Sequence, residues 1–512
     1  MLSSKSIFLA LLSWSLIVST PSLATPYNHN TVKIQAAFEF SSIDPSRSGY
    51  VFTRMQVIET LVDVNEKGQL TPALASDWNI LDNGLRWRFT LRNGVQFHNG
   101  QTLTSEDVVH ALNIARTKPG VWQGVPVTDI TAPDEQHVDI LLNSPYRPLG
   151  AIIANYASAI LAPASYSDDN VVRELIGTGP FSIYEVQVPH RAVVQRFPEY
   201  WGKVAEVEYA RYLTGHRAEA RVLQARSGQG DIVFGLDPAS VPMLKRMPNL
   251  TIEQTDLPRT LALKLNAAHP LLNTQSTRQA LSLAINREGI ANAVLRTPNA
   301  ATEQLLPAYM SDWYVANTDT SQQLEKAKSL LAAEGWQRNS DGLLERNGKL
   351  FELTLITYAD RPELTAVATA IQDQWRQLGV KLNVNITNSS AIPAGHQDGS
   401  LEVALIARNY GTIADPLGVL IKDFGQDKGG DWGSTGWSNQ DIKPTLSALV
   451  KETDESRYNQ QAQRIAQAIY DEKPLIPIAY YVQQTAVTKR LSGFRYDPYE
   501  RSYFLNELSW NN

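Results

Sequence analysis

Hydrophobic positions recur with two different periods along this chain. Alternation of apolar and polar residues predicts strands at 30–40, 135–144 and 350–359. Apolar residues spaced three and four apart predict helices at 50–65, 104–116, 276–295, 321–336 and 364–378, and within 456–481, where a helix passes into a proline-bounded strand. Helices and strands that mix in this way indicate an α/β protein.

Local signals fix several boundaries of these elements. Thr104 is expected to cap the helix at 104–116, with Asp107 three residues later. Gly379 ends the helix at 364–378, and the run 380–386 then reads as a strand, a helix–Gly–strand unit that builds α/β layers. Asn93-Gly94 predicts a hairpin between two short strands in 85–100.

The first residues predict export. One charge at Lys5, an apolar run from Ile7 to Val18 and a small-residue exit at Ser22-Leu23-Ala24 form a signal peptide, cleaved near Ala24. An uncleaved anchor is the alternative, but the apolar run is short for a membrane span. The chain has no cysteine, so it carries no lipidation cysteine, disulfide or thiolate metal site. We therefore expect a periplasmic protein.

Composition and charge exclude some partners. The 43% hydrophobic and 19% charged content is ordinary for a globular protein, and the 512 residues are enough for two or three domains. The net charge of −6, without a basic block, argues against nucleic acid. Aromatic residues, including 11 Trp and 20 Tyr, are plentiful enough to line a ligand pocket as well as a core.

Motifs for catalysis are missing. The chain contains no Gly-x-Ser-x-Gly elbow, phosphate loop or Rossmann glycine pattern. The acidic pairs Glu106-Asp107 and Asp168-Asp169 are adjacent in sequence, so they point apart on regular structure and are expected to serve as surface or capping groups. We expect no enzyme, and an exported hydrolase is the remaining alternative because active sites need no local motif.

Several longer stretches together are typical of one family. They are "LTPALASDWNILDNGLRWRFTLRNGVQFHNGQTLTSEDVVHAL" (70–112), "IGTGPFSIYE" with "PEYWG" (176–202), "GDIVFGL" (230–236), "TLALKLNAAHPLLNTQSTRQALSLAINREGI" (260–290), "AKSLLAAEGW" (327–336) and "ADPLGVL" (414–420). The chain resembles the extracytoplasmic solute-binding proteins of peptide- and nickel-type ABC importers, the family 5 solute-binding proteins. The resemblance covers nearly the whole mature chain. In it, Gly177-Thr178-Gly179-Pro180 is a scaffold turn that leads into a strand.

The resemblance implies a fold and partners. The fold is a two-lobed α/β periplasmic binding protein fold with a hinge and an interlobe ligand cleft, class II and cluster C-like. Lobe I would comprise residues 25–255 and 482–512, and lobe II residues 256–481. A monomer would enclose its ligand by closing about the hinge. It would then deliver the ligand to an ABC permease and ATPase in the inner membrane.

The resemblance also places candidate ligand contacts. Residue by residue, the family motifs fall here on Trp122, Arg361, Arg408, Tyr410, Asp415 and Trp432, with Arg54 as a further candidate. Peptide-binding relatives pair an aspartate with the ligand's ammonium group and an arginine with its carboxylate. Asp415 fits the first role, and Arg361 or Arg408 the second, because a guanidinium fork matches two carboxylate oxygens. An aspartate before a proline also caps turns, so both readings of Asp415 stay open.

The ligand itself has two candidate classes. Eight histidines are scattered without metal-ligand spacing, so we expect no protein metal site and no cofactor. His98 is expected to be structural. The nickel-type relatives bind a chelated metal with a histidine after the Asp-Pro and a pocket arginine, and this chain has neither in the matching segments, 417–433 and 155–166. We therefore expect a small peptide or peptide-like ligand, with a chelate of nickel or another metal as the alternative.

Overall fold

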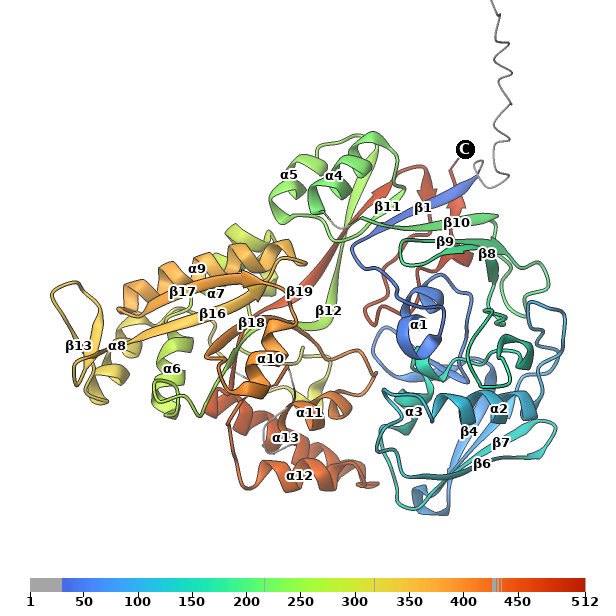
Figure 1. The fold of residues 1–512 in the computed structure, drawn as a ribbon, viewed down its shortest axis with the longest axis horizontal. Coiled ribbons are helices and arrows are strands. Elements are labelled where there is room, and N and C mark those ends of the chain that lie inside the picture. Colours follow the sequence, from blue (N-terminus) through green and yellow to red (C-terminus); the bar gives the residue numbers. More distant parts are fainter. Residues whose placement is uncertain are drawn as a thin grey trace, which may run out of the picture.

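The structure is a computed structural model that describes residues 30–511, except 216, 317, 426–429, 431 and 434. The predicted signal peptide, residues 1–24, lies outside the described residues. The chain forms two lobes that lie side by side (Figure 1). One is built mainly from the first half of the sequence and the other from residues after about 266. This is the two-lobed α/β architecture that the resemblance implies.

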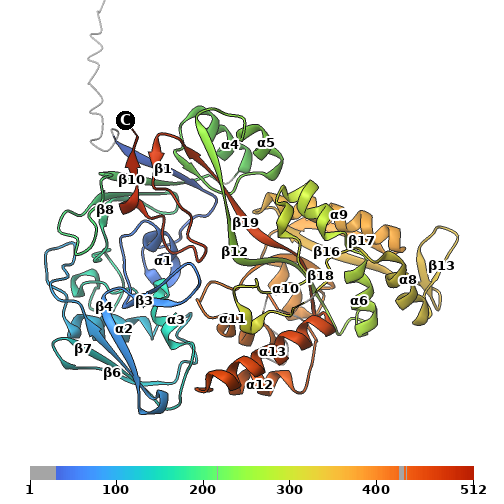
Figure 2. The same ribbon diagram turned by 180° about the vertical axis from the view of Figure 1, so that it is seen from behind.

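One ten-stranded sheet runs through both lobes (Figure 2). Its strands follow in the order β17 (Lys381–Thr387), β16 (Glu352–Tyr358), β18 (Val403–Asn409), β12 (Leu250–Leu265), β19 (Leu475–Thr488), β11 (Ile232–Val233), β1 (Thr31–Ala36), β10 (Tyr209–Thr214), β9 (Arg191–Arg196) and β8 (Phe181–Gln187). The long antiparallel strands β12 and β19 cross from one lobe to the other and pair along most of their length. They form the physical connection about which the lobes can move.

Lobe I contains a second sheet and short helices. The sheet has the order β4 (Ala75–Leu81), β5 (Arg86–Leu91), β7 (His137–Leu142) and β6 (Val127–Asp134). The other elements of this lobe are α1 (Pro45–Arg54), β2 (Val62–Val64), β3 (Leu70–Pro72), α2 (Ser105–Ala115), α3 (Leu149–Ile153), α4 (Ala218–Ser227), α5 (Val241–Leu244), β20 (Leu491–Ser492) and β21 (Ser509–Trp510). The capping box that the sequence predicts at α2 is present, because Thr104 and Asp107 satisfy each other's backbone N–H groups.

Lobe II packs helices around its part of the large sheet. These are α6 (Gln275–Leu283), α7 (Arg287–Gly289), α8 (Leu324–Ala333), α9 (Pro362–Leu378), α10 (Ala391–Asp398), α11 (Pro416–Phe424), α12 (Ile442–Leu449) and α13 (Glu455–Glu472), with a small sheet of β13 (Gln337–Arg338), β14 (Leu344–Arg346) and β15 (Lys349–Leu350). The predicted helix–Gly–strand unit is confirmed. α9 ends at Gly379, whose φ of 101° is a left-handed conformation that glycine tolerates, and β17 follows.

The buried hydrophobic residues divide between the lobes. One cluster runs from Leu261 to Ala479 and fills lobe II, while separate clusters fill lobe I around the four-stranded sheet and around β1 and β10. The lobe boundaries predicted near residues 255 and 482 fall inside β12 and β19, and they remain a prediction.

Three predicted elements differ from the structure. The helix predicted at 50–65 is wrong in position: α1 begins after Asp44 and ends at Arg54, because Gln56 takes a left-handed φ of 57°. The hairpin predicted at 85–100 is wrong: Asn93-Gly94 does turn the chain, but β5 pairs with β4 and β7 instead of with the residues that follow. The helix predicted at 276–295 is interrupted, because the Asn286 side chain caps a new turn by accepting from the N–H of Gly289.

The Gly-Thr-Gly-Pro turn packs directly against another stretch of backbone. A Cβ on Gly177 would lie 2.2 Å from the carbonyl oxygen of Val57. Around this contact, the buried Glu59 carboxylate accepts hydrogen bonds from Thr178 (2.8 Å) and from Tyr200 (2.8 Å), and Trp201 donates to it as well. Burial raises the pKa of Glu59 to about 7, against the effect of these donors. Thr178 of the Gly-Thr-Gly-Pro turn and the Tyr200-Trp201 pair of the segment PEYWG therefore donate to the same carboxylate. This supports the interpretation of both segments as scaffold.

His98 completes the same scaffold. Its Nδ1 accepts from the N–H of Gly177 (3.2 Å), and its Nε2 lies 3.0 Å from the carbonyl of Gly179, an arrangement that suits the neutral ring with the proton on Nε2. Burial lowers the pKa of His98 to about 4. The predicted structural role of this histidine is consistent with these contacts.

Candidate ligand-binding site

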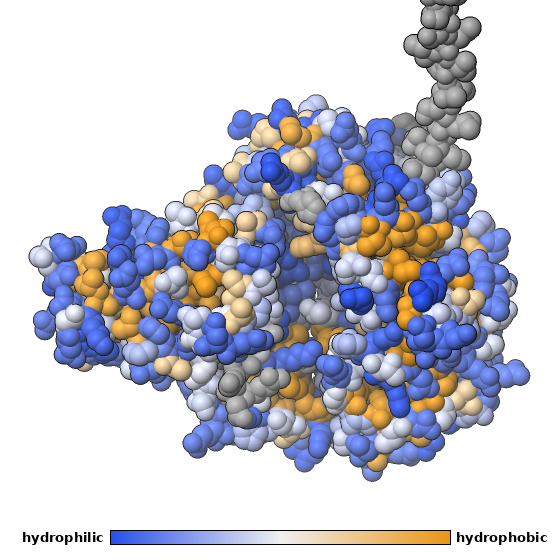
Figure 3. Space-filling model, viewed as in Figure 1, coloured by the Kyte–Doolittle hydropathy of each residue, from blue (hydrophilic) through white to orange (hydrophobic). Residues whose placement is uncertain are grey.

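A large cavity separates the two lobes. It has a volume of about 920 Å³ and is lined from lobe I by segments 67–70, 80–87 and 145–151, and from lobe II by segments 309–313, 414–416 and 452–458. The surface is hollowed between the lobes in the space-filling view (Figure 3). Its size matches that of small-molecule sites, which lie preferentially between domains. We call it the interlobe cavity.

Asp415 lies at the lobe II wall of this cavity. It is the N-cap of α11, where its Oδ1 accepts from the N–H of Leu417 at 2.9 Å and Pro416 occupies the first helical position. Among the described residues the carboxylate has no ion-pair partner. Burial raises the pKa of Asp415, although the hydrogen bond from Leu417 lowers it. The structure thus leaves a partly buried carboxylate facing a space that a ligand can enter.

Aromatic side chains and further charges complete the cavity wall. The aromatic residues are Trp87, Tyr146, Tyr309, Trp313, Tyr458 and Tyr499. Four carboxylates and two basic groups also line it: Asp312, Asp415, Glu452, Glu455, Lys67 and Arg147. The balance is acidic, so the cavity favours a positively charged group over a negatively charged one.

A second, small pocket lies at the hinge. It is lined by Phe38, Arg54, Arg221, Arg259, Arg361, Tyr481, Glu500 and their neighbours, and we call it the hinge pocket. Arg259 pairs with Glu500 at 2.5 Å, and Arg54 lies 3.6 Å from the same carboxylate. Burial opposes the ionisation of Glu500, but these two arginines lower its pKa to about 2. Because guanidinium groups outnumber carboxylates here, the pocket favours a negatively charged group.

Arg361 has no ion pair within the described part of the chain. It precedes α9, and its guanidinium lies 5.0 Å from the centre of the Tyr481 ring and 5.4 Å from that of Phe38. Burial lowers its pKa, but Tyr481 and Glu363 outweigh that effect and the net shift is upward. Arg361 is therefore a permanently charged donor at the lobe interface, held by aromatic faces.

The remaining predicted contacts line neither the interlobe cavity nor the hinge pocket. Arg408 forms a two-bond pair with the buried carboxylate of Asp423 (2.7 and 2.6 Å). Tyr410 is fully buried in the core of lobe II, and its hydroxyl has no hydrogen-bond partner among the described residues. Trp122 is packed in the core of lobe I, and Trp432 packs edge-on against Tyr358. Their predicted ligand contacts stay predictions.

Sequence reasoning missed most of the residues that line the two pockets. Asp312, Tyr146, Tyr309, Tyr458, Tyr499, Arg259 and Glu500 come from segments that are far apart in the chain. No motif spacing joins such segments. The only local signals were small ones, such as the acidic and aromatic run 312–314 in a stretch without regular pattern.

A metal site is not formed by the described residues. Within them, no group of three or more histidine, aspartate or glutamate side chains is arranged to hold a metal ion. Neither the interlobe cavity nor the hinge pocket is lined by a histidine. His29 and His216 lie outside the described part of the chain.

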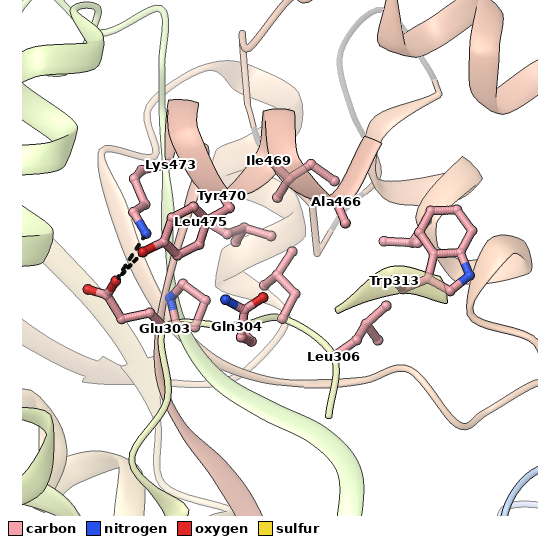
Figure 4. Close-up of a pocket in the computed structure, with 12 residues that line it drawn as sticks. Glu303, Gln304, Leu306, Trp313, Ala466, Ile469, Tyr470, Lys473 and Leu475 are labelled. Atoms are coloured by element: carbon pink, nitrogen blue, oxygen red, sulfur yellow. Dashed lines mark hydrogen bonds and ion pairs between the residues drawn. The ribbon is translucent and has the colours of Figure 1, made fainter. Parts of the chain in front are cut away.

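A third cavity, of about 20 Å³, lies in lobe II and shares Trp313 with the interlobe cavity (Figure 4). Its far end carries Glu303, which lies 3.6 Å from Lys473 and accepts a hydrogen bond from Tyr470 at 2.9 Å. Arg287 pairs with the other oxygen of Glu303 at 3.1 Å. Burial lowers the pKa of Lys473 to about 8. The volume suffices for one water molecule, so we regard this cavity as part of the core.

The fold and the interlobe cavity define a two-lobed solute-binding protein. The chain belongs to the bacterial extracellular solute-binding proteins of family 5, since the family described as "Bacterial extracellular solute-binding proteins, family 5 Middle" matches residues 69–431. Substrate-binding proteins of this family serve ABC transporters for nickel and peptides. The named relatives are binding proteins, not enzymes, which supports a binding role at the level of the family.

Individual relatives differ in their ligands. The chain is 25% identical to the nickel-binding protein NikA of Staphylococcus aureus (91% of each chain) and 24% identical to the oligopeptide-binding protein AppA of Bacillus subtilis (88% of this chain, 85% of the relative). The crystal structure of NikA from Brucella suis in complex with Fe(III)-EDTA shares the fold, with a TM-score of 0.85, 18% identity and coverage of 94% and 100%. The relatives are periplasmic or extracytoplasmic. In residues 30–511, as far as they are described, no helix has the length and apolar character to span a membrane.

Proposed function

We propose that this protein is the periplasmic solute-binding component of an ABC importer and captures a small peptide or peptide-like compound between its lobes. It then delivers the ligand to the membrane permease, and the ATPase drives uptake. The family membership supports the class of function. The ligand is inferred from the two pockets.

The observation that carries the proposal is the carboxylate of Asp415 in the interlobe cavity. Within the described residues it lacks an ion pair, and it lies in an acidic cavity with aromatic walls. A ligand ammonium group provides both a counter-charge and hydrogen-bond donors for such a carboxylate. Lobe closure removes water around the pair, and lower local polarity strengthens the attraction.

The basic hinge pocket offers a counter-charge to the other end of a peptide, and its volume of about 30 Å³ requires the lobes to part around it before a carboxylate enters. Arg361 is charged, held by aromatic faces and not engaged by a carboxylate in the described structure. Arg408 is already engaged by Asp423, so Arg361 is the stronger of the two predicted partners for a ligand carboxylate. Tyr499 lines the interlobe cavity and Glu500 lines the hinge pocket, and an amine site with a carboxylate site would suit a zwitterionic amino-acid compound.

A metal chelate is the second candidate. The excess of guanidinium groups in the hinge pocket would also suit the carboxylates of an anionic chelator. Because no histidine lines either pocket, the chelator would have to supply the metal's ligands.

Isothermal titration of the ligand-stripped, refolded protein distinguishes these ligands. We expect Ala-Ala to bind and N-acetyl-Ala-Ala, which lacks the ammonium group, to bind at least about tenfold more weakly, as the loss of a charge-assisted hydrogen bond predicts. Binding of a nickel–histidine complex without binding of either dipeptide would overturn the peptide assignment. Unchanged affinity after acetylation would overturn the role of the ammonium group.

A further inference from the structure

We propose that the interlobe cavity selects a ligand with a second positive charge, carried by a basic side chain next to the ligand's ammonium group and held by Asp312. This inference rests on the proposed function, because it names the class of peptide that the same cavity prefers. It adds a specificity residue that neither the family motifs nor the sequence pattern indicated.

Asp312 lies in the turn Ser311–Trp313, between two side chains that also line the cavity, Met310 and Trp313. In the described structure its carboxylate neither accepts a hydrogen bond nor forms an ion pair, and the residue is half-buried. Burial raises its pKa, the neighbouring Glu455 raises it further, and Arg147 opposes both. The site therefore destabilises the isolated negative charge, and a cation there would relieve the penalty.

The other carboxylates of the cavity already have partners. Glu455 accepts from Arg147 at 2.6 Å, and Glu452 accepts from Arg457 at 3.2 Å. The guanidinium of Arg147 also lies 3.7 Å from the centre of the Tyr458 ring. Asp312 and Asp415 are thus the two cavity carboxylates that have no basic partner among the described residues.

The basic groups of the cavity do not compensate for these two carboxylates. Both come from lobe I: Arg147 is held by Glu455 and Tyr458, and Lys67 is exposed. The arrangement around Arg147 also shows what this wall of the cavity accepts, namely a guanidinium between a carboxylate and an aromatic face. An arginine side chain of a ligand carries the same group, and a lysine side chain carries the same charge on an ammonium group.

Polar and aromatic atoms without partners support a ligand in this place. Tyr499 is only 7% exposed and lines the cavity, and its hydroxyl has no hydrogen-bond partner within the described residues. The hydroxyl lies against Gly68, where a Cβ would come within 2.2 Å of it. Tyr309 is 44% exposed at the same cavity, although it is a large aromatic residue. Such rings attract cations through their faces.

The test compares four dipeptides on the ligand-stripped, refolded full-length mature protein by isothermal titration. Lys-Ala and Arg-Ala carry the second charge, Ala-Ala lacks it, and Glu-Ala reverses it. We expect Lys-Ala and Arg-Ala to bind about tenfold more tightly than Ala-Ala, and Glu-Ala to bind most weakly, which is the change expected for one partly buried ion pair. The preference should decrease as salt is added, because the cavity is open to solvent before closure.

Two variants assign the preference to its residue. Asp312→Asn should abolish the advantage of Lys-Ala over Ala-Ala, while Ala-Ala still binds through Asp415. Asp341 is an exposed aspartate in the turn between β13 and β14, and Asp341→Asn is the matched control that should change neither the affinity for Ala-Ala nor the advantage of Lys-Ala. Thermal melting confirms that both variants fold.

The outcomes separate this inference from the proposed function. Equal binding of Lys-Ala and Ala-Ala, or a preference that survives in Asp312→Asn, would overturn the role of Asp312 while the dipeptide site stands. Failure of all four dipeptides to bind would overturn the proposed function, and this inference with it.

Discussion

Asp415 occupies a position that is compatible with both roles that the sequence left as alternatives. The residue caps α11, as an aspartate before a proline often does, and the same carboxylate faces the interlobe cavity. A cap needs only one of the two oxygens, because a single backbone N–H from Leu417 is satisfied. The remaining acceptor capacity is what we propose the ligand uses.

The substitution Asp415→Asn therefore tests whether the negative charge of this residue contributes to ligand binding. Asparagine caps helices about as well as aspartate, so we expect the melting temperature to stay unchanged. The affinity for Ala-Ala should fall about tenfold or more, since the charged acceptor is lost. For the unmodified protein, affinity should also fall on acidification, at a higher pH than for an ordinary aspartate, because the pKa of Asp415 is raised. An Asn variant that binds as tightly as the parent would contradict the ammonium site.

Lys473 gives a prediction about stability. Its pKa is lowered to about 8 by burial, so between roughly pH 8 and pH 10 the unfolded chain binds the proton more tightly than the folded one. Stability should then rise with pH across that window by roughly 2–4 kcal/mol from this group. Lys473→Met should remove this rise, while Glu303 keeps Arg287 and Tyr470 as partners.

Urea unfolding of the parent and of Lys473→Met from pH 7 to pH 10 measures this effect. The difference between their free energies of unfolding isolates Lys473, because the other groups that titrate in this range contribute equally to both proteins. Parallel curves for the parent and Lys473→Met would show that Lys473 keeps an ordinary pKa.

At the residue scale, sequence identified three charged candidates that line the pockets, Asp415, Arg361 and Arg54, but not their surroundings. Asp415 and Arg361 carried local signals, a proline that follows and a strand end that precedes. Arg408 carried a similar signal, yet the fold places the Asp423 carboxylate beside it. Arg408 in β18 and Asp423 in α11 are fifteen positions apart, and their pairing depends on tertiary packing, which no local pattern shows.

Elements with strong periodicity or caps were predictable. The capping box of α2 and the unit α9–Gly379–β17 were confirmed because their determinants are local. The hairpin at 85–100 was wrong because the preceding strand β4 and the distant strand β7 pair with the two edges of β5. Strand pairing is non-local, so a good turn signal does not fix which strands pair.

The Gly-Thr-Gly-Pro segment gives a test at the element scale. Gly177→Ala would place a methyl group 2.2 Å from the Val57 carbonyl oxygen, a backbone atom that cannot rotate away. We expect a loss of roughly 1–3 kcal/mol in the free energy of unfolding, as for overpacked cores. The control is Gly418→Ala in α11, where the nearest contact is the flexible Ile413 side chain at 3.3 Å and alanine favours the helix.

Urea midpoints of the two variants decide this point. A Gly177→Ala protein as stable as the parent would mean that the turn does not hold its close approach in solution.

The whole molecule is organised for closure. Within the described residues, the two lobes contain largely different hydrophobic clusters, the long strands β12 and β19 connect them, and the large cavity lies between them. Sequence could predict this plan because family motifs are spread over most of the chain. It could not predict the charge of the cavity, which sums contributions from both lobes.

Small-angle X-ray scattering tests closure. Saturating Lys-Ala should reduce the radius of gyration, because the ligand bridges the lobes. Asp415→Asn at the same ligand concentration should keep the larger value. A radius that does not change in the parent, despite binding seen by titration, would contradict capture by closure.

The most direct measurement is native mass spectrometry of the protein purified from periplasm without refolding. The account predicts a bound species of small mass that fragments as amino acids and contains a lysine or arginine. A bound mass with a metal isotope pattern, or a metal that leaves only together with an organic acid, would contradict the peptide assignment and support a chelate.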